Sequence, residues 1–217
     1  MKVVDLSQQN SVLNNFIRDI RDVEIQKDSL RFRRNIERIG EVIAIELSKA
    51  LEYRQTITQT PLDKAKVNIV AEQIVVSSIL RAGLPLHNGI LSIFDDAQNA
   101  FVSAYRKYRN ANDFDIHVEY ISSPDLNDKT LIIADPMLAT GGSMEMSYKA
   151  LLSKGTPANI HLASVISSQY AIDYLQTVMP EHITLWTATI DEKIDEHAYI
   201  VPGLGDAGDL AYGEKLD

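Results

Sequence analysis

Hydrophobic residues in the N-terminal part of the chain recur at the spacing of an α-helix. The clearest run has apolar residues every three or four positions, at Ile36, Ile39, Ile43, Leu47 and Leu51. This spacing predicts an amphipathic helix over residues 30–54. Asp28 and Ser29 stand before it and can accept hydrogen bonds from its first backbone N–H groups. A shorter helix is predicted over residues 10–22.

The pattern changes near residue 73, where short apolar runs rich in β-branched residues begin to alternate with helical segments. Strands are predicted at residues 73–80, 100–105, 116–121, 130–134, 159–166 and 183–190. Helices are predicted at residues 85–94, 141–153 and 169–178. Strands that alternate with helices are typical of an α/β fold, in which a parallel sheet is flanked by helices on both faces.

The apolar residues of the C-terminal tail follow neither the helical period nor the strand period. Residues 199–210 are rich in glycine and proline, so we expect no regular element there. The segment is either an ordered functional loop or a frayed end.

The length, composition and charge of the chain limit the classes of function that it can have. The 217 residues suffice for one domain with a buried core, and no apolar run is long enough to predict a membrane span. There is no cysteine and the N-terminus lacks the build of a secretion signal, so a cytoplasmic protein is expected. The net charge of −9 argues against nucleic acid and membrane partners. Any phosphate site must therefore be built locally.

The strongest chemical signal is the segment DPMLATGGS at residues 135–143, directly after the apolar strand 130–134. Ligands of open α/β sheets bind at the carboxyl ends of strands. Small residues let the backbone approach a ligand, and the first N–H groups of the following helix favour an anion. We interpret the segment as a phosphate-binding turn. The alternative is a turn whose glycines serve only the chain reversal.

Four segments together resemble the uracil phosphoribosyltransferases, which join uracil to the ribose of 5-phosphoribosyl-1-diphosphate (PRPP) and form UMP. DPMLATGGS is similar to their PRPP-binding turn, and SILRAGL at 78–84 to their diphosphate loop. Tyr105-Arg106 resembles the base of a mobile catalytic loop, and YIVPGLGDAGD at 199–209 resembles a uracil-binding hood. The resemblance covers roughly residues 28–213.

The resemblance implies a pentosyltransferase with a phosphoribosyltransferase-type parallel sheet, N-terminal helices and a C-terminal hood. The catalytic residues would be Arg106, Asp135 and Asp206. PRPP would be held by Arg81, Arg106, Asp135, Pro136, Met137, Leu138, Ala139, Thr140, Gly141, Gly142, Ser143 and Asp206. Uracil would be held by Ile200, Gly205, Asp206 and Ala207. Magnesium would arrive on PRPP, near Asp206, without a direct protein ligand.

Three of these residues also have a simpler interpretation. Arg81 could be a surface ion pair, Arg106 part of a solvated charge run, and Asp135 a helix cap. If Arg81 instead lies in a diphosphate loop, we expect a strained backbone or a cis non-proline peptide near residues 81–83.

We expect a single domain over residues 1–217, with N-terminal helices at 10–54, a core at 70–190 and the hood at 191–213. Residues 106–121 would close over the reactants. The relatives imply a homodimer or higher homo-oligomer, with GTP as a possible effector. Two alternatives stay open: a non-catalytic sensor of PRPP or UMP, because the loop after Arg106 differs from the family pattern, and a phosphoribosyltransferase for another base.

Overall fold

The structure is a computed structural model that describes the backbone of residues 1–110 and 113–216 and the side chains of residues 1–103 and 120–216. Its centre is a sheet with the order β1-β10-β9-β7-β4-β5-β6, while β8 pairs with β9. The strands are β1 Lys2–Asp5, β4 Ile74–Leu80, β5 Gln98–Asn110, β6 Asp113–Ser122, β7 Thr130–Ala134, β8 Met137–Leu138, β9 Asn159–Ser168 and β10 Thr184–Asp191. Every pairing is parallel except β5 with β6. The predicted α/β class is confirmed.

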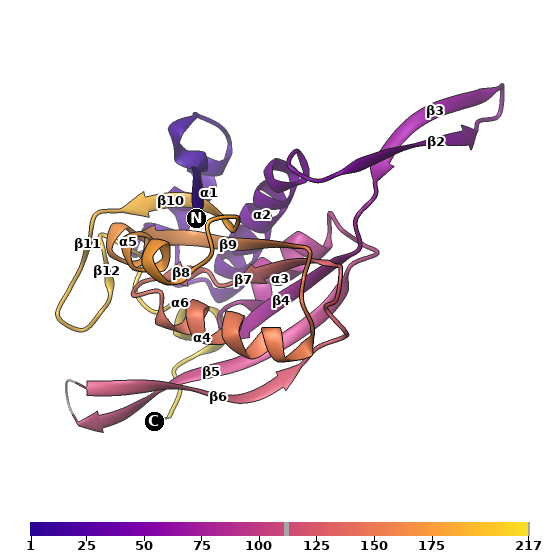
Figure 1. Ribbon diagram of the computed structural model, residues 1–217. Helices are drawn as coiled ribbons and strands as arrows, with labels where there is room; N and C mark the ends of the chain where they lie inside the picture. The colour runs from indigo at the N-terminus through magenta and orange to yellow at the C-terminus, as the bar shows by residue number, and fades with distance from the viewer. Residues whose placement is uncertain (111–112, 217) are drawn as a thin grey trace.

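Helices cover both faces of this sheet (Figure 1). They are α1 Leu13–Arg21, α2 Ser29–Ser48 and α3 Leu84–Leu91 on one face, and α4 Gly142–Leu151 and α5 Gln169–Val178 on the other. Short 3₁₀ turns occur at η1 Leu6–Gln8 and η2 Leu152–Lys154. Alternate residues of β7 point to opposite faces of the sheet. Ile132 packs against the helices of one face, which include α2 and α3, and Leu131 and Ile133 pack against α4 and α5 on the other. This alternation follows from the period of a strand.

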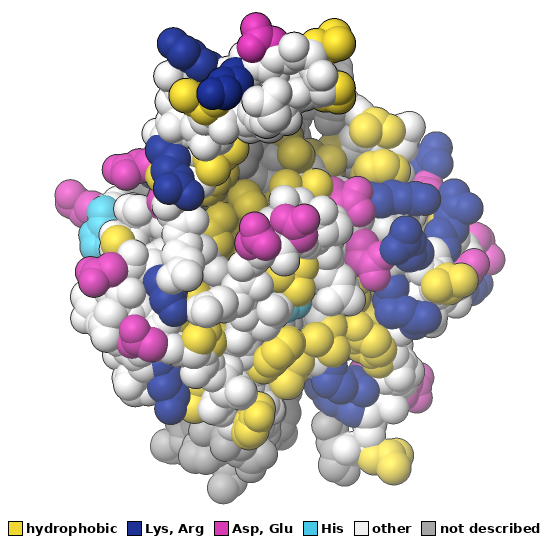
Figure 2. Space-filling view, turned by 90° about the vertical axis from the view of Figure 1, so that its right-hand side faces the viewer, with side chains coloured by type: hydrophobic (Ala, Val, Ile, Leu, Met, Phe, Trp, Pro, Cys, Tyr) yellow, Lys and Arg dark blue, Asp and Glu magenta, His cyan; other side chains and the backbone are white. Residues whose placement is uncertain are grey.

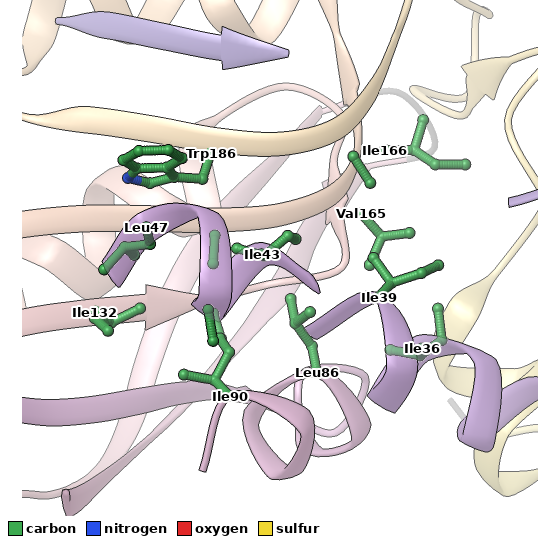
Figure 3. Packing of buried hydrophobic residues seen from close by; sticks show 14 of the residues in the cluster. Ile36, Ile39, Ile43, Leu47, Leu86, Ile90, Ile132, Val165, Ile166 and Trp186 are labelled. Atoms are coloured by element: carbon green, nitrogen blue, oxygen red, sulfur yellow. The ribbon is translucent and has the colours of Figure 1, made fainter. Parts of the chain in front are cut away.

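The predicted apolar stripe of α2 is the centre of one core layer. Ile39, Ile43 and Leu47 are fully buried, and they pack in one cluster with Ile132, Val165 and Trp186 of the sheet (Figure 3). The side chain of Asp28 accepts a hydrogen bond from Arg31 N at 3.1 Å, which confirms the expected cap.

The predicted end of this helix is wrong. α2 ends at Ser48, and β2 Tyr53–Gln59 forms an antiparallel hairpin with β3 Lys64–Val70. The hairpin extends away from the sheet (Figure 1), and most of its side chains are exposed. It therefore has no buried face in this structure. β3 nevertheless alternates apolar Ala65, Val67 and Ile69 with polar residues, so a signal for a strand was present in the sequence and was missed.

Other strands of the central sheet also differ from the expectation. β5 and β6 are longer than the predicted 100–105 and 116–121, and they form one antiparallel pair. The edge strand β1 was not predicted, because it is a four-residue segment beside the chain terminus.

The expectation that residues 199–210 contain no regular element is also wrong. β11 Lys193–Ile194 pairs with β12 Ile200–Val201, and α6 Ala207–Tyr212 follows. Asp206 caps α6, since its Oδ1 accepts a hydrogen bond from Asp209 N at 3.0 Å. Below, "the hood" means residues 191–213. Within the described part of the chain, no helix combines the length and apolar character needed to cross a bilayer.

Candidate functional site

A cavity of about 550 Å³ lies between the hood and the carboxyl ends of the parallel strands. The sheet side contributes Ile79, Leu80, Arg81, Ala82, Ser103, Asp135, Met137, Ala139 and Ser143. The C-terminal side contributes Ala198, Tyr199, Ile200, Gly205, Asp206, Ala207, Gly208, Asp209 and Lys215. Segments more than a hundred residues apart in the sequence thus form one site, at the edge where open α/β sheets bind ligands.

The turn after β7 forms a smaller pocket of about 30 Å³ beside this cavity. Its lining residues are Asp135, Met137, Leu138, Ala139, Thr140, Gly141, Ser143 and Met144. The pocket lies at the start of α4, whose first N–H groups have no partner within the helix and favour an anion.

Neighbouring elements hold this turn in place. Gly141 has a φ of 84°, a left-handed conformation that suits glycine. A Cβ at Gly141 would lie 2.9 Å from the ring of Tyr174. Ser168 at the start of α5 donates to Ala139 O at 2.6 Å and accepts from Ala171 N at 2.9 Å. The turn is therefore fixed by α5 as well as by its own sequence.

The loop after β4 brings Arg81 to the other side of the cavity. The peptide bond between Leu80 and Arg81 is cis, as expected for this loop. Gly83 packs closely behind it: a Cβ there would lie 2.5 Å from Ile79 O and 2.9 Å from Ala134 O. The Arg81 side chain is 43% exposed, and its Nη2 donates to Asp209 Oδ1 at 3.0 Å. Arg81 therefore forms an ion pair, as the simpler interpretation proposed. This pair lies inside the cavity, because both Arg81 and Asp209 line it.

The hood closes the cavity with backbone groups and acidic side chains. Gly203 and Gly205 have positive φ, and the bond from Val201 to Pro202 is cis. Ile200 and Ala207 are buried. From α2, Arg33 donates to Ala211 O at 2.5 Å and lies over the ring of Tyr212, which fixes the end of α6.

The chain matches the description "Uracil phosphoribosyltransferase" over residues 7–214. It belongs to the uracil phosphoribosyltransferase family. A uracil phosphoribosyltransferase of Porphyromonas gingivalis is 60% identical, with all of both chains covered. One of Methanothermobacter thermautotrophicus is 40% identical over 88% of this chain and 87% of its own. The solved structure of the AQ2163 protein of Aquifex aeolicus is 25% identical and has a TM-score of 0.87, over 97% of this chain and 98% of its own.

The structure brings together most residues selected by the family resemblance. Arg81, Asp135, Asp206 and the uracil-binding candidates line the large cavity, while Leu138, Thr140 and Gly141 line the smaller pocket. Pro136 and Gly142 line neither. Pro136 O accepts hydrogen bonds from Val165 N and Ile166 N, so this residue joins the turn to β9. The side chain of Arg106 lies outside the described residues.

Several cavity residues had no predicted role, namely Ser103, Ala198, Tyr199, Gly208, Asp209 and Lys215. Tyr199, Gly208 and Asp209 lie in the hood motif, and a role for Asp209 could have been inferred from its acidic side chain beside Asp206. Nothing in the sequence near Lys215 distinguishes it from other surface lysines. Only the path of the C-terminal segment brings it to the cavity.

Among the described residues that line the cavity, carboxylates outnumber cations. Asp135, Asp206 and Asp209 line it together with two cations, Arg81 and Lys215. A polyanionic ligand therefore needs the backbone N–H groups of the turn, and a cation that accompanies the ligand would offset the carboxylates.

Proposed function

We propose that this chain is a uracil phosphoribosyltransferase that converts uracil and PRPP into UMP and diphosphate. The observation that carries the proposal is that the phosphate-binding turn and the hood line one cavity from opposite sides. A ligand in this cavity can place its phosphate in the turn and its base against the hood, with its ribose between them.

The residues of the turn suit a 5-phosphate. Residues 139–143 offer backbone N–H groups and the hydroxyls of Thr140 and Ser143. Asp135, at the end of β7, lines both pockets, so its carboxylate can accept hydrogen bonds from ribose hydroxyls. Arg81 supplies a planar guanidinium for diphosphate, and Arg106 is proposed to add a second when residues 106–121 close.

The hood is proposed to recognise uracil through main-chain atoms of Ile200, Gly205 and Ala207. Uracil presents an acceptor, a donor and an acceptor along one edge. Cytosine has an amino group in place of the first acceptor, so a donor would meet a donor in the same site. Leaving a buried polar group unpaired costs about 1–3 kcal/mol, which disfavours cytosine.

In the reaction, the bond between the anomeric carbon and diphosphate breaks, and a bond from uracil nitrogen to the same carbon forms. The proton of this nitrogen passes to the departing diphosphate or to water. Arg81 neutralises charge on the departing diphosphate, while the turn and hood hold the two reactants in line. Closure of the cavity would exclude water, which otherwise hydrolyses the activated sugar.

The described donors fit magnesium carried by PRPP. Asp135 and Asp206 are oxygen donors that line the same cavity, and magnesium prefers oxygen ligands. Asp206 uses Oδ1 to cap α6, so one of its oxygens is already engaged. The ion would neutralise phosphate charge when bound; Asp206 would orient it, with most of its ligands from PRPP and water.

A homodimer or higher homo-oligomer remains our proposal for the assembly. The β2–β3 hairpin supports it, because Ile57 and Leu62 are 65% and 97% exposed. Figure 2 views the molecule from the side of this hairpin and shows apolar side chains open at its surface. A two-stranded hairpin alone is only marginally stable in water, so a second copy would stabilise it. Activation by GTP, the cytoplasmic location and the single catalytic domain with its three parts stay predictions.

The deciding experiment incubates the protein with magnesium, PRPP and uracil, with and without GTP, and measures UMP and diphosphate. We expect both products in equal amounts. Competition with cytosine, hypoxanthine and orotate tests a phosphoribosyltransferase for another base. Binding of PRPP or UMP without turnover would instead support the sensor. The presence of Arg81, Asp135 and Asp206 favours the enzyme over the sensor.

A further inference from the structure

An ion pair outside the cavity joins the first helix to the hood. Arg21 is the last residue of α1, and Asp191 is the last residue of β10. The two side chains form a bidentate pair, with Nη1 2.8 Å from Oδ2 and Nη2 2.7 Å from Oδ1. Asp191 is 7% exposed and Arg21 is 22% exposed at the side chain. Charge-assisted pairs of this geometry are strong and directional.

Both members of this pair also bind one glycine of the hood. Gly203 N donates to Asp191 Oδ2 at 2.9 Å, and Arg21 Nη1 donates to Gly203 O at 3.0 Å. The two backbone polar groups of Gly203 are thus satisfied by the ion pair. The φ of Gly203 is 54°, and a Cβ there would lie 2.1 Å from Ile200 O. The ion pair therefore holds a tight turn that only glycine fits.

This turn lies between the backbone positions proposed to read uracil. Ile200 precedes Gly203 by three residues, and Gly205 follows it by two. Both line the cavity, whereas Gly203, Arg21 and Asp191 do not. Because recognition through main-chain atoms depends on their exact placement, whatever fixes Gly203 also fixes the donors and acceptors on either side of it.

We propose that Arg21 and Asp191 are positioning residues for uracil specificity, acting through Gly203 on the hood. The pair contacts neither substrate. The inference rests on the proposed uracil-binding role of the hood. It predicts that loosening the pair weakens uracil binding and base discrimination while leaving the PRPP side of the cavity intact.

The test compares Arg21→Lys, Asp191→Asn and the double variant with the wild-type enzyme. Each substitution keeps a polar side chain of similar length but removes the bidentate, charged contact between Arg21 and Asp191. We expect KM for uracil to rise about tenfold, as for loss of a charged hydrogen bond, with KM for PRPP within about twofold. The ratio of kcat/KM for uracil over cytosine should fall by a similar factor. Since both residues act on the same glycine, the double variant should lose little more than either single variant.

Arg31→Lys is the matched control, because Arg31 forms an ion pair with Asp19 that does not reach the hood. It should leave both KM values unchanged. Equal rises in KM for uracil and PRPP, or an unchanged KM for uracil in folded variants, would overturn the inference. Gly205→Ala separates this failure from failure of the proposed site: Gly205 has a φ of 92°, and no atom lies within 4 Å of the position that a Cβ would take there. If this variant also leaves KM for uracil unchanged, the hood itself is not the uracil site.

Discussion

Arg81 and Asp209 form an ion pair inside the cavity, with Nη2 of the arginine 3.0 Å from Oδ1 of the aspartate. The same nitrogen lies 3.4 Å from Gly213 O. Arginine has five N–H donors, so contacts through Nη2 leave other donors of the guanidinium for a ligand. Asp209 thus orients a cation whose remaining donors can bind diphosphate.

Arg81→Lys should raise KM for PRPP by about tenfold or more, because an ammonium cannot reproduce the planar bidentate contact. KM for uracil should stay nearly constant. Asp209→Asn should raise KM for PRPP less, and it should have no further effect in the Arg81→Lys background. Steady-state kinetics of the four proteins measure this coupling. Additive effects would show that Asp209 does not act through Arg81.

Asp206→Asn separates the two roles of Asp206. The side-chain oxygen of asparagine can still cap α6, so the melting temperature should change little. The loss of negative charge beside PRPP should lower kcat by about a hundredfold, in the range of other removed electrostatic groups. Asp206→Ala should lose activity and also about 1 kcal/mol of stability, because the cap is gone. Wild-type turnover by either folded variant would refute the assigned role.

The sequence was sufficient to predict the parts of this site that have local signals. Strand β7, the turn at residues 135–143 and the start of α4 follow from an apolar run, small residues and the helical period. The apolar stripe of α2 was also predictable, because Ile39 and Ile43 recur at the helical period and the face that they form packs on the sheet.

Other features depend on contacts between distant segments. Arg21 is an unremarkable arginine in the sequence, and only the fold places it against Asp191. The β2–β3 hairpin lies outside the core, although the alternation of Ala65, Val67 and Ile69 in β3 did carry a local signal for a strand. α6 was missed because it is only six residues long and directly follows a run rich in glycine and proline; the Asp206 cap and the contact from Arg33 hold it in place.

Gly141→Ala should damage the proposed phosphate-binding turn. The left-handed φ of 84° costs about 1–2 kcal/mol for a residue with a side chain, and the added Cβ would press on Tyr174. We expect higher KM for PRPP and weaker inhibition by UMP. Gly155→Ala is the control, because Gly155 also has a positive φ and a crowded Cβ position but lines neither pocket. It should reduce stability while leaving KM for PRPP unchanged.

Lys215 offers a test of charge in the C-terminal segment. It lines the cavity, and none of the described residues forms an ion pair with it. Lys215→Ala should raise KM for PRPP about threefold at low ionic strength, as expected for an exposed charge, and the effect should fade in high salt. Lys154→Ala, in η2 and away from both pockets, is the matched control. An effect independent of salt would argue against a direct electrostatic role.

Stability at mildly acidic pH should depend on His87, a buried residue of α3 that is 1% exposed. Its Nε2 lies 2.7 Å from Asn99 Oδ1, while Nδ1 is buried without a hydrogen-bond partner. Burial lowers the pKa of His87 below its usual value of 6.5, and the hydrogen bond with Asn99 offsets this only in part. A protonated ring would carry a second N–H with no acceptor. The folded state therefore favours neutral His87.

The unfolded chain binds this proton first, so the free energy of unfolding should fall as pH drops below about 6.5 toward the lower pKa of the folded state. Each such histidine contributes a slope of at most about 1.4 kcal/mol per pH unit. Burial also lowers the pKa of His161, so this residue should contribute in the same direction.

His87→Leu should remove the part of this pH dependence that His87 contributes. The substitution should leave no new unpaired group, because Asn99 is exposed and can bond water instead. Urea unfolding at pH 5.5 and 7.5 measures the difference, and His182→Leu, an exposed histidine, is the control. An identical pH dependence in His87→Leu and the wild type would contradict this account.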